Sequence, residues 1–307
     1  MGKKELEAGY QVYIEKILKR LNDARKIGVY RITEYSSGNY RIFNCGVHME
    51  LLVGTKYALL FDTGHGFGDL RAAVKQITHL PLIVVNSHGH LDHTCGNSWF
   101  DGDIYIHPED MALCRTHNSF ELRKAGVEMA KGQIFPGIAS LPENFEEDVY
   151  CSRGCGNLVG LKEGHVFDLG GKTLEVVELP GHTRGSIGLL YREEKLLFAG
   201  DAINGAVWLF LEESLPLSVY METLQKAQSI DFHNLVMAHD FRMPGKEILK
   251  VYLDTARNLD FEQGIPFASP FQGKERDVRQ CLRPGYGAME VFEPGFASIV
   301  IERGKLR

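Results

Sequence analysis

The chain has 307 residues, a formal net charge of -6 at pH 7, 44% hydrophobic residues and 24% charged residues. This composition is ordinary for a globular protein, and the length is sufficient for one large domain with a substantial core. The mildly acidic balance, without a block of like charges, argues against general electrostatic binding to nucleic acid or to an anionic membrane. We therefore expect no nucleic-acid partner and no membrane partner.

The N-terminal segment, residues 1–27, predicts a surface helix and no export signal. Apolar residues recur at helical spacing over residues 4–26, which is typical of an amphipathic helix packed on a core. The segment lacks an apolar stretch of signal-peptide length, so we expect a cytoplasmic protein. The six cysteines follow no regular framework, which favours free thiols. Cys151 and Cys155 are the only close pair, and without a second pair they are interpreted as part of a loop that binds no metal.

Strand signals dominate the next part of the chain. β-Branched and aromatic runs predict antiparallel strands within residues 29–35, 40–54 and 57–64. A helix over residues 68–78 is expected to precede a buried strand at 81–87 and a further strand at 103–108. Residues 109–150 have a mostly helical pattern, and we interpret them as an insertion that covers the functional site as a lid.

The C-terminal half mixes hairpins with helices. Hairpins are expected over residues 165–180 and 185–202, followed by a helix, a strand and a helix over residues 218–229, 234–240 and 246–258. The extension at 264–307 is rich in Gly and Pro and ends in a strand at 296–303. No linker or repeat divides the chain, so we predict one domain over residues 1–307. Two strand-rich halves with outer helices predict an α/β fold of two mixed sheets packed face to face, with helices on both outer faces.

The densest chemical signal is the run SHGHLDH at residues 87–93, directly after an apolar strand. In such a turn, the alternate residues His88 and His90 can face one point while Asp92 and His93 face another. Neutral imidazole suits zinc or iron, and a carboxylate admits harder ions. A single histidine is ordinarily a polar residue without a metal, but four potential ligands within six positions predict a metal site.

Three later residues, His182, Asp201 and His239, also follow apolar strands at turns or strand ends. Rigid elements of this kind can aim side chains into a shared cleft. With the first motif they supply seven ligands. This number is enough for two metals that each keep a position open for water or substrate, as catalysis requires.

The order HxHxDH, then GHTxGS, then GD, then a His after an apolar strand resembles the metallo-β-lactamase superfamily. The resemblance extends from about Val29 to Phe261 and implies an αββα four-layer sandwich. The resemblance assigns His88, His90 and His182 to the first metal, and Asp92, His93 and His239 to the second. Asp201 matches the carboxylate that bridges the two metals. Asp62 in LLFDTG matches an aspartate that hydrogen-bonds a ligand imidazole and fixes its tautomer; an Asp that caps a turn is the alternative.

Departures from particular branches narrow the implied function. Members that hydrolyse β-lactams carry Cys or another residue at the position of Asp201, and the flavo-diiron branch has Glu at the position of His90. RNA-processing members share much of the ligand set, but this chain lacks a basic arm interleaved with aromatic residues. The remaining resemblance is to glyoxalase II-like hydrolases, although their glutathione-binding segment is not recognisable here.

We therefore predict a binuclear hydrolase that uses metal-activated water on a small ester, thioester, lactone or phosphoester. Asp92 or Asp201 is expected to pass a proton to the leaving group. The two divalent ions are expected to be zinc, with iron or manganese as alternatives. A non-haem iron persulfide dioxygenase, an RNA-processing nuclease and a metal-stabilised binding protein without turnover are the alternative functions.

The sequence gives weaker support for substrate-binding residues, because each candidate could equally have a packing role or lie on the surface. They are His65, Arg184, Trp208 and Phe210. The lid and the lack of a basic groove favour a small-molecule substrate. The sequence leaves the oligomeric state open, a homodimer included.

Overall fold

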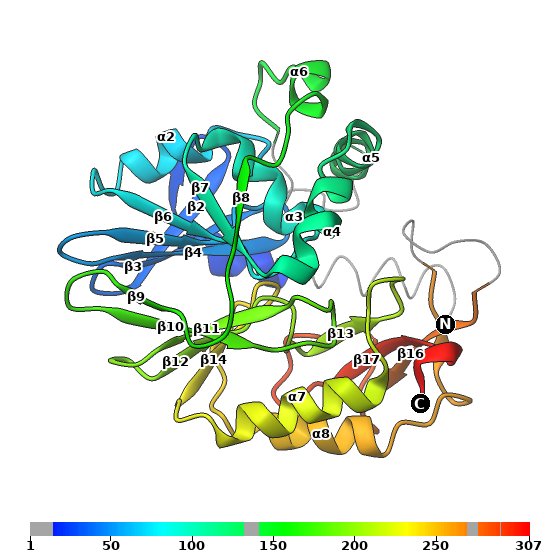
Figure 1. The fold of residues 1–307 in the computed structure, drawn as a ribbon. Coiled ribbons are helices and arrows are strands. Elements are labelled where there is room, and N and C mark those ends of the chain that lie inside the picture. The colour runs from blue at the N-terminus through cyan, green and yellow to red at the C-terminus, as the bar shows by residue number, and fades with distance from the viewer. Residues whose placement is uncertain (1–14, 132–140, 269–275, 289) are drawn as a thin grey trace. The chain divides into compact units, whose positions relative to one another are not determined.

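A computed structural model describes residues 15–131, 141–268, 276–288 and 290–307 (Figure 1). The chain divides into two compact units, Met1–Glu175 and Val176–Arg307. The single domain expected over residues 1–307 stays a prediction.

The first unit is built on an eight-stranded sheet in which the strands follow one another in chain order. Neighbours from β1 to β5 pair antiparallel, and neighbours from β5 to β8 pair parallel, so the sheet is mixed. Its strands are β1 (Arg25–Ile27), β2 (Tyr30–Ser36), β3 (Asn39–Asn44), β4 (Val47–Val53), β5 (Ala58–Phe61), β6 (Leu82–Val85), β7 (Asp103–Ile106) and β8 (Asn157–Gly160).

Parallel neighbours need a crossover connection, and the helices of this unit lie in those connections. The β5–β6 crossover contains α2 (Leu70–Lys75), and the β6–β7 crossover contains α3 (Leu91–Thr94) and the 3₁₀ helix η1 (Cys95–Trp99). The expected insertion at 109–150 forms most of the β7–β8 crossover. Its helical segments are η2 (Pro108–Asp110), α4 (Met111–His117), α5 (Phe120–Lys131) and α6 (Glu147–Cys151). Residues 132–140 of this crossover lie outside the described residues.

The core of the first unit explains why its strands form. Tyr30 and Ile32 of β2 are buried, and every residue of β5 is buried. Apolar side chains of the sheet pack against Leu70, Ala73 and Val74 of α2; they include Ile42, Met49, Leu51 and Leu60. Asp69 caps α2 by accepting a hydrogen bond from the Ala72 backbone N–H at 2.8 Å, which satisfies one free donor of the first turn. Residues 15–21 are helical, and residues 4–14 of the expected first helix lie outside the described residues.

Two further mixed sheets follow. The five-stranded sheet has the order β14-β12-β11-β10-β9, with β12 and β14 parallel. Its strands are β9 (Val166–Asp168), β10 (Thr173–Glu178), β11 (Ile187–Tyr191), β12 (Leu196–Phe198) and β14 (Asn234–Val236). The four-stranded sheet has the order β13-β17-β16-β15, with β13 and β17 parallel. Its strands are β13 (Ala206–Leu209), β15 (Ile265–Pro266), β16 (Val278–Leu282) and β17 (Ser298–Glu302).

Two amphipathic helices complete the core of the second unit, α7 (Leu217–Ser229) and α8 (Ile248–Arg257). Their buried faces pack with strand residues in one apolar cluster, which contains Leu197, Leu209, Leu224, Leu235, Leu253 and Ile299. Burial of each such side chain contributes about 1.5–3 kcal/mol, so this cluster is the main source of stability in the unit.

Most elements expected from the sequence are confirmed, including the two hairpins and the helices at 218–229 and 246–258. The structure differs in the C-terminal half, where the strands form two sheets in place of one. The second of these sheets forms because β13 and β16 both pair with β17, which lies far from β13 in the sequence. No helix in the described ranges has both the length and the apolar character needed to cross a bilayer.

The close approach of two loops in the first unit leads to a stability prediction. A Cβ added at Gly96 would lie 2.1 Å from the Thr63 carbonyl oxygen, so backbone must move. We expect Gly96→Ala to lower the free energy of unfolding by about 1–3 kcal/mol, measured by urea denaturation.

The matched control is Gly102→Ala, where an added Cβ meets nothing within 4 Å. That variant should stay within about 0.5 kcal/mol of the parent protein. Equal stability of the two variants would contradict the close approach.

Candidate metal centre

The first ligand group lies in the turn after β6. His90 is the extended residue before α3, and this short helix presents Asp92 in its first turn and His93 in its last. A residue larger than glycine does not fit at position 89 without a backbone shift, since an added Cβ would lie 2.8 Å from the backbone nitrogen of Cys114. Glycine at this position therefore lets the turn pass close to α4.

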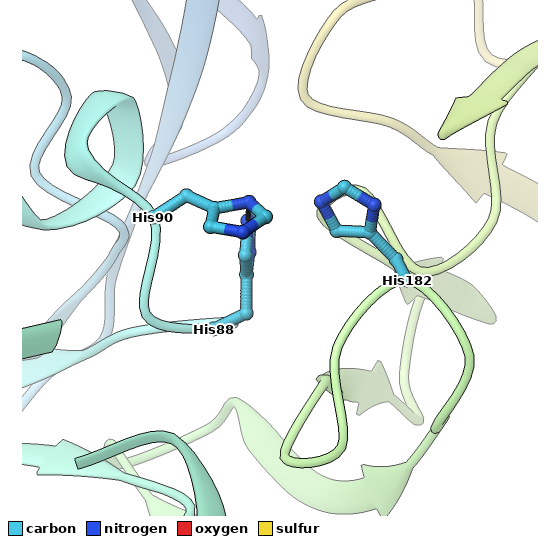
Figure 2. Close-up of side chains that lie close together, drawn as sticks. All are labelled: His88, His90 and His182. Atoms are coloured by element: carbon cyan, nitrogen blue, oxygen red, sulfur yellow. Dashed lines mark hydrogen bonds between the residues drawn. The ribbon is translucent and has the colours of Figure 1, made fainter. Parts of the chain in front are cut away.

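His88 and His90 point their nitrogens toward one another (Figure 2). His88 Nε2 lies 3.0 Å from His90 Nδ1, and the two rings are at 85°. Two nitrogens bound to one tetrahedral zinc at about 2.0–2.1 Å are separated by roughly 3.3 Å. The pair therefore has the spacing of two ligands of a single metal ion.

Asp62 holds this turn in place through hydrogen bonds to Ser87 and His93. It is buried, at the end of β5, with a positive φ of 66°. One carboxylate oxygen accepts a hydrogen bond from the Ser87 backbone N–H at 2.7 Å. The other accepts from Ser87 Oγ at 2.8 Å and from His93 Nδ1 at 2.8 Å. The contact expected between Asp62 and a motif imidazole is thus present.

These hydrogen bonds determine where the histidine lone pairs lie. The single hydroxyl proton of Ser87 is donated to Asp62, so its oxygen accepts from His88 Nδ1 at 2.9 Å. His93 likewise carries its proton on Nδ1, toward Asp62. Both imidazoles are left with a lone pair on Nε2, the form that binds a metal. His93 Nε2 lies 3.5 Å from Asp92 Oδ2.

The second ligand group belongs to the second unit. His182 is buried on the loop between β10 and β11, and its Nδ1 donates to the Trp208 carbonyl oxygen at 2.8 Å. This bond leaves the lone pair on Nε2. Asp201 Oδ2 lies 3.8 Å from His182 Nε2 and 3.2 Å from His239 Nε2. One carboxylate therefore faces two imidazoles, as a bridging ligand would.

The donors in each unit are imidazole nitrogens and carboxylate oxygens, which suit zinc, iron and related ions. The first unit holds His88, His90, Asp92 and His93, and the second holds His182, Asp201 and His239. Their role as metal ligands stays a prediction.

Two residues of the β7–β8 crossover also contact the turn, and the sequence did not single them out. Asp110 Oδ2 accepts a hydrogen bond from the Gly89 backbone N–H at 2.9 Å. His117 Nδ1 accepts from the Leu91 backbone N–H at 3.3 Å, and its ring lies 4.8 Å from that of His90. Contact of this kind arises from tertiary packing, so no local motif could have marked it. The lid function of residues 109–150 stays a prediction.

A buried ion pair lies beside Asp62. Glu50 pairs with Phe61 in the β4–β5 register, and its carboxylate lies 2.7 Å from Arg41 Nε. Burial raises the pKa of Glu50 to about 7, Arg41 opposes this shift, and the negative charge of Asp62 adds to it. Protonation of Glu50 near neutral pH therefore removes a negative charge next to the residue that orients His93.

The four candidates for substrate binding lie in different environments. His65 is buried and stacks on Phe67 at 5.1 Å, and Arg184 is exposed. Trp208 is half-buried and contacts His182 through its carbonyl group. Phe210 is fully buried in an apolar cluster, which gives its ring a packing role and no exposed surface for a substrate. A substrate contact by His65, Arg184 or Trp208 stays a prediction.

The sequence of this chain is similar to those of several known proteins. The sequence model of the metallo-beta-lactamase superfamily matches residues 156–260. The acyl-coenzyme A thioesterase MBLAC2 of Bos taurus is 31% identical over 57% of this chain, and the chain spans 63% of the length of that relative. The hydroxyacylglutathione hydrolase of Mesorhizobium japonicum is 28% identical over 52% of this chain and 48% of its own.

A solved metallo-beta-lactamase from Pontibacter korlensis aligns with a TM-score of 0.51 and 17% identity, over 75% of this chain and 99% of the other. This likeness confirms the predicted fold class, an α/β fold with mixed sheets. The sequence match over residues 156–260 and the fold both make the chain similar to members of the metallo-β-lactamase superfamily.

Proposed function

We propose that the chain is a metal-dependent hydrolase that cleaves small thioesters of the acyl-coenzyme A type. The observation that carries this proposal is the full donor set, in which the Nδ1–H groups of His88, His93 and His182 donate hydrogen bonds and so leave the Nε2 lone pairs for a metal. The names of the relatives supply the substrate class, because acyl-coenzyme A and acylglutathione both join an acyl group to sulfur.

The proposed ligand assignment follows the resemblance. His88, His90 and His182 hold one ion, while Asp92, His93 and His239 hold the other. Asp201 bridges them, and its Oδ2 contacts with His182 and His239 support that role, because these imidazoles are assigned to different ions. Two divalent ions held by these residues would supply a hydroxide nucleophile at neutral pH and would polarise the substrate carbonyl.

The remaining chemistry falls to side chains of this protein. Asp92 is partly exposed, with 26% of its side chain accessible, and can take a proton at Oδ2 and give it to the leaving sulfur. Asp62 and Ser87 hold His88 and His93 in the tautomers that bind the metals. The Trp208 carbonyl holds His182 in the same way.

Zinc is the proposed native metal, since it favours the imidazole-rich set and four-coordinate sites, with iron or manganese as alternatives. The proposed location is the cytoplasm, which agrees with six free cysteines and no disulfide. The β7–β8 crossover is the proposed lid, because Asp110 and His117 already contact the ligand turn.

The activity is tested with the metal-loaded full chain and a series of acyl-coenzyme A substrates, with release of free thiol as the signal. We expect thiol release that a chelator abolishes and added zinc restores, and much lower rates on a lactone and a phosphodiester. Hydrolysis of the phosphodiester alone, or thiol release that is insensitive to chelation, would overturn the proposal.

Asp201→Ala tests the bridging role. The remaining histidines still supply a three-imidazole set, so we expect one metal to be lost and the other retained. Turnover should fall by several orders of magnitude, while the fold survives. Elemental analysis per chain and the thiol-release rate are the measurements.

Asp231→Ala is the control, since this carboxylate is exposed and paired with Lys195. It should keep both metals. Two tightly bound metals and normal turnover in Asp201→Ala would show that the bridging assignment is wrong.

Ser87→Ala tests the hydrogen-bond relay from Asp62 to His88. Without the hydroxyl, His88 Nδ1 loses the acceptor that sets its tautomer, so metal affinity should fall about 10–100-fold. Competition with a chromogenic chelator measures this affinity. Ser98→Ala is the matched control, because Ser98 Oγ bonds only the nearby Cys95 carbonyl oxygen at 3.3 Å. Equal metal affinities in the two variants would show that the relay does not support metal binding.

A further inference from the structure

A fully buried arginine lies in the crossover between β7 and β8, where it joins three separate segments of the first unit. Arg123 belongs to α5. Its Nη2 group donates hydrogen bonds to the Cys95 carbonyl oxygen at 2.9 Å, to Asn118 Oδ1 at 2.6 Å and to the Gly154 carbonyl oxygen at 3.1 Å. One guanidinium therefore connects the residue after α3, the residue after α4 and the loop after α6.

Two further hydrogen bonds, the Asn118–Thr94 relay, extend from Arg123 to the ligand turn. Asn118 Nδ2 donates to Thr94 Oγ1 at 2.9 Å, and the Thr94 hydroxyl donates to the His90 carbonyl oxygen at 2.9 Å. Because a guanidinium can only donate, Asn118 must turn its amide oxygen toward Arg123 and its nitrogen toward Thr94. The single hydroxyl proton of Thr94 is then left to donate to His90. Arg123 thus sets the direction of each hydrogen bond in the relay.

The relay holds one end of α3, and Arg123 itself holds the other. His90 directly precedes this helix, and Cys95 directly follows it. α3 has only four residues, so its own hydrogen bonds are too few to keep it in place. It carries two proposed ligands, Asp92 and His93. The positions of these ligands are set by contacts from outside the helix, and the contacts from the crossover are among them.

The burial of Arg123 lowers stability unless the residue has a role beyond packing. Its hydrogen-bond partners within the described ranges are neutral, namely two backbone carbonyls and one amide. The ring of Tyr150 lies 4.9 Å from its guanidinium carbon. Removing a charge from water without an opposite charge is unfavourable, and a well-packed apolar side chain avoids this cost. The charge is therefore better explained by the groups that it holds than by the volume that it fills.

We propose that Arg123 is a positioning residue for the metal centre, and that it acts on the ligands of the turn through the two ends of α3. Arg123 has no part in the chemical step. It keeps the turn in the geometry that binds metal, which gives the β7–β8 crossover a part in metal binding. The inference rests on the ligand assignment of the proposed function, and it is independent of the substrate that is hydrolysed.

Arg123→Met tests this role, since methionine is long and apolar but cannot donate a hydrogen bond. The metal-free full-length proteins are titrated with Co²⁺, and the visible absorption of the bound ion is recorded. We expect the Co²⁺ affinity of the variant to fall about 10–100-fold and its absorption bands to differ from those of the parent protein, because the ligands are no longer held in place. An unchanged affinity and spectrum would overturn the inference. Absence of Co²⁺ binding by the parent protein would overturn the proposed metal centre and this inference with it.

Val127→Ala is the matched control, because Val127 is fully buried in the same helix and lies outside the relay. This variant should have a lower urea midpoint than the parent protein, since it leaves a cavity, and should keep the parent Co²⁺ affinity and spectrum. An equal loss of Co²⁺ affinity in Val127→Ala and Arg123→Met would show a general effect of destabilisation. That result would also overturn the inference.

Thr94 tests the relay without changing Arg123, which matters if Arg123→Met does not fold. Thr94→Val removes the hydroxyl with little change in shape, whereas Thr94→Ser keeps it. We expect Thr94→Val to bind Co²⁺ more weakly than the parent protein and Thr94→Ser to bind it nearly as tightly. Equal Co²⁺ affinities in the two Thr94 variants would contradict the relay and with it the proposed role of Arg123.

Discussion

The carboxylate of Asp62 is the constraint on which the first ligand group depends. It sits at the end of β5 in a left-handed backbone conformation, which Asp tolerates better than most residues. From there it holds both Ser87, at the end of β6, and His93, in α3. One buried charge thus ties the ends of two parallel strands and a helix together and sets the tautomers of two ligands assigned to different metals. A substitution of Asp62 would therefore disturb both proposed metal positions.

Much of the fold could be predicted because the signals are local. The hairpins of β9–β10 and β11–β12 follow from alternation and turn residues. Residues 40–54 were expected to form one continuous run, but the chain turns at Cys45 and Gly46, both with positive φ, to form the β3–β4 hairpin. The HxHxDH turn lies within one short segment, and its role as a metal site stays a prediction. Strand β16 escaped prediction because its polar residues make sense only once it pairs with β15 and β17. Asp110 and His117 escaped for the same reason, since their role comes from the packing of α4 against the turn.

The run CSRGC shows how a contact made by tertiary packing stays hidden in a sequence. The buried guanidinium of Arg123 donates to the Gly154 carbonyl oxygen, beside Cys155, and to Asn118 Oδ1, so it joins this run to the segment after α4. The expectation that the run binds no metal stays a prediction, but its interpretation as a plain loop omitted this network.

The two ligand groups are prepared in different ways. In the first unit, a buried carboxylate orients His88 and His93, whereas in the second a backbone carbonyl orients His182 and Asp201 faces two imidazoles. Metal binding to either group would favour the native state of the unit that holds it, since a ligand that binds only the folded form shifts the unfolding equilibrium by mass action. The hydrogen bonds that set each tautomer therefore contribute to catalysis and to the stability of the metal-loaded chain through the same lone pairs.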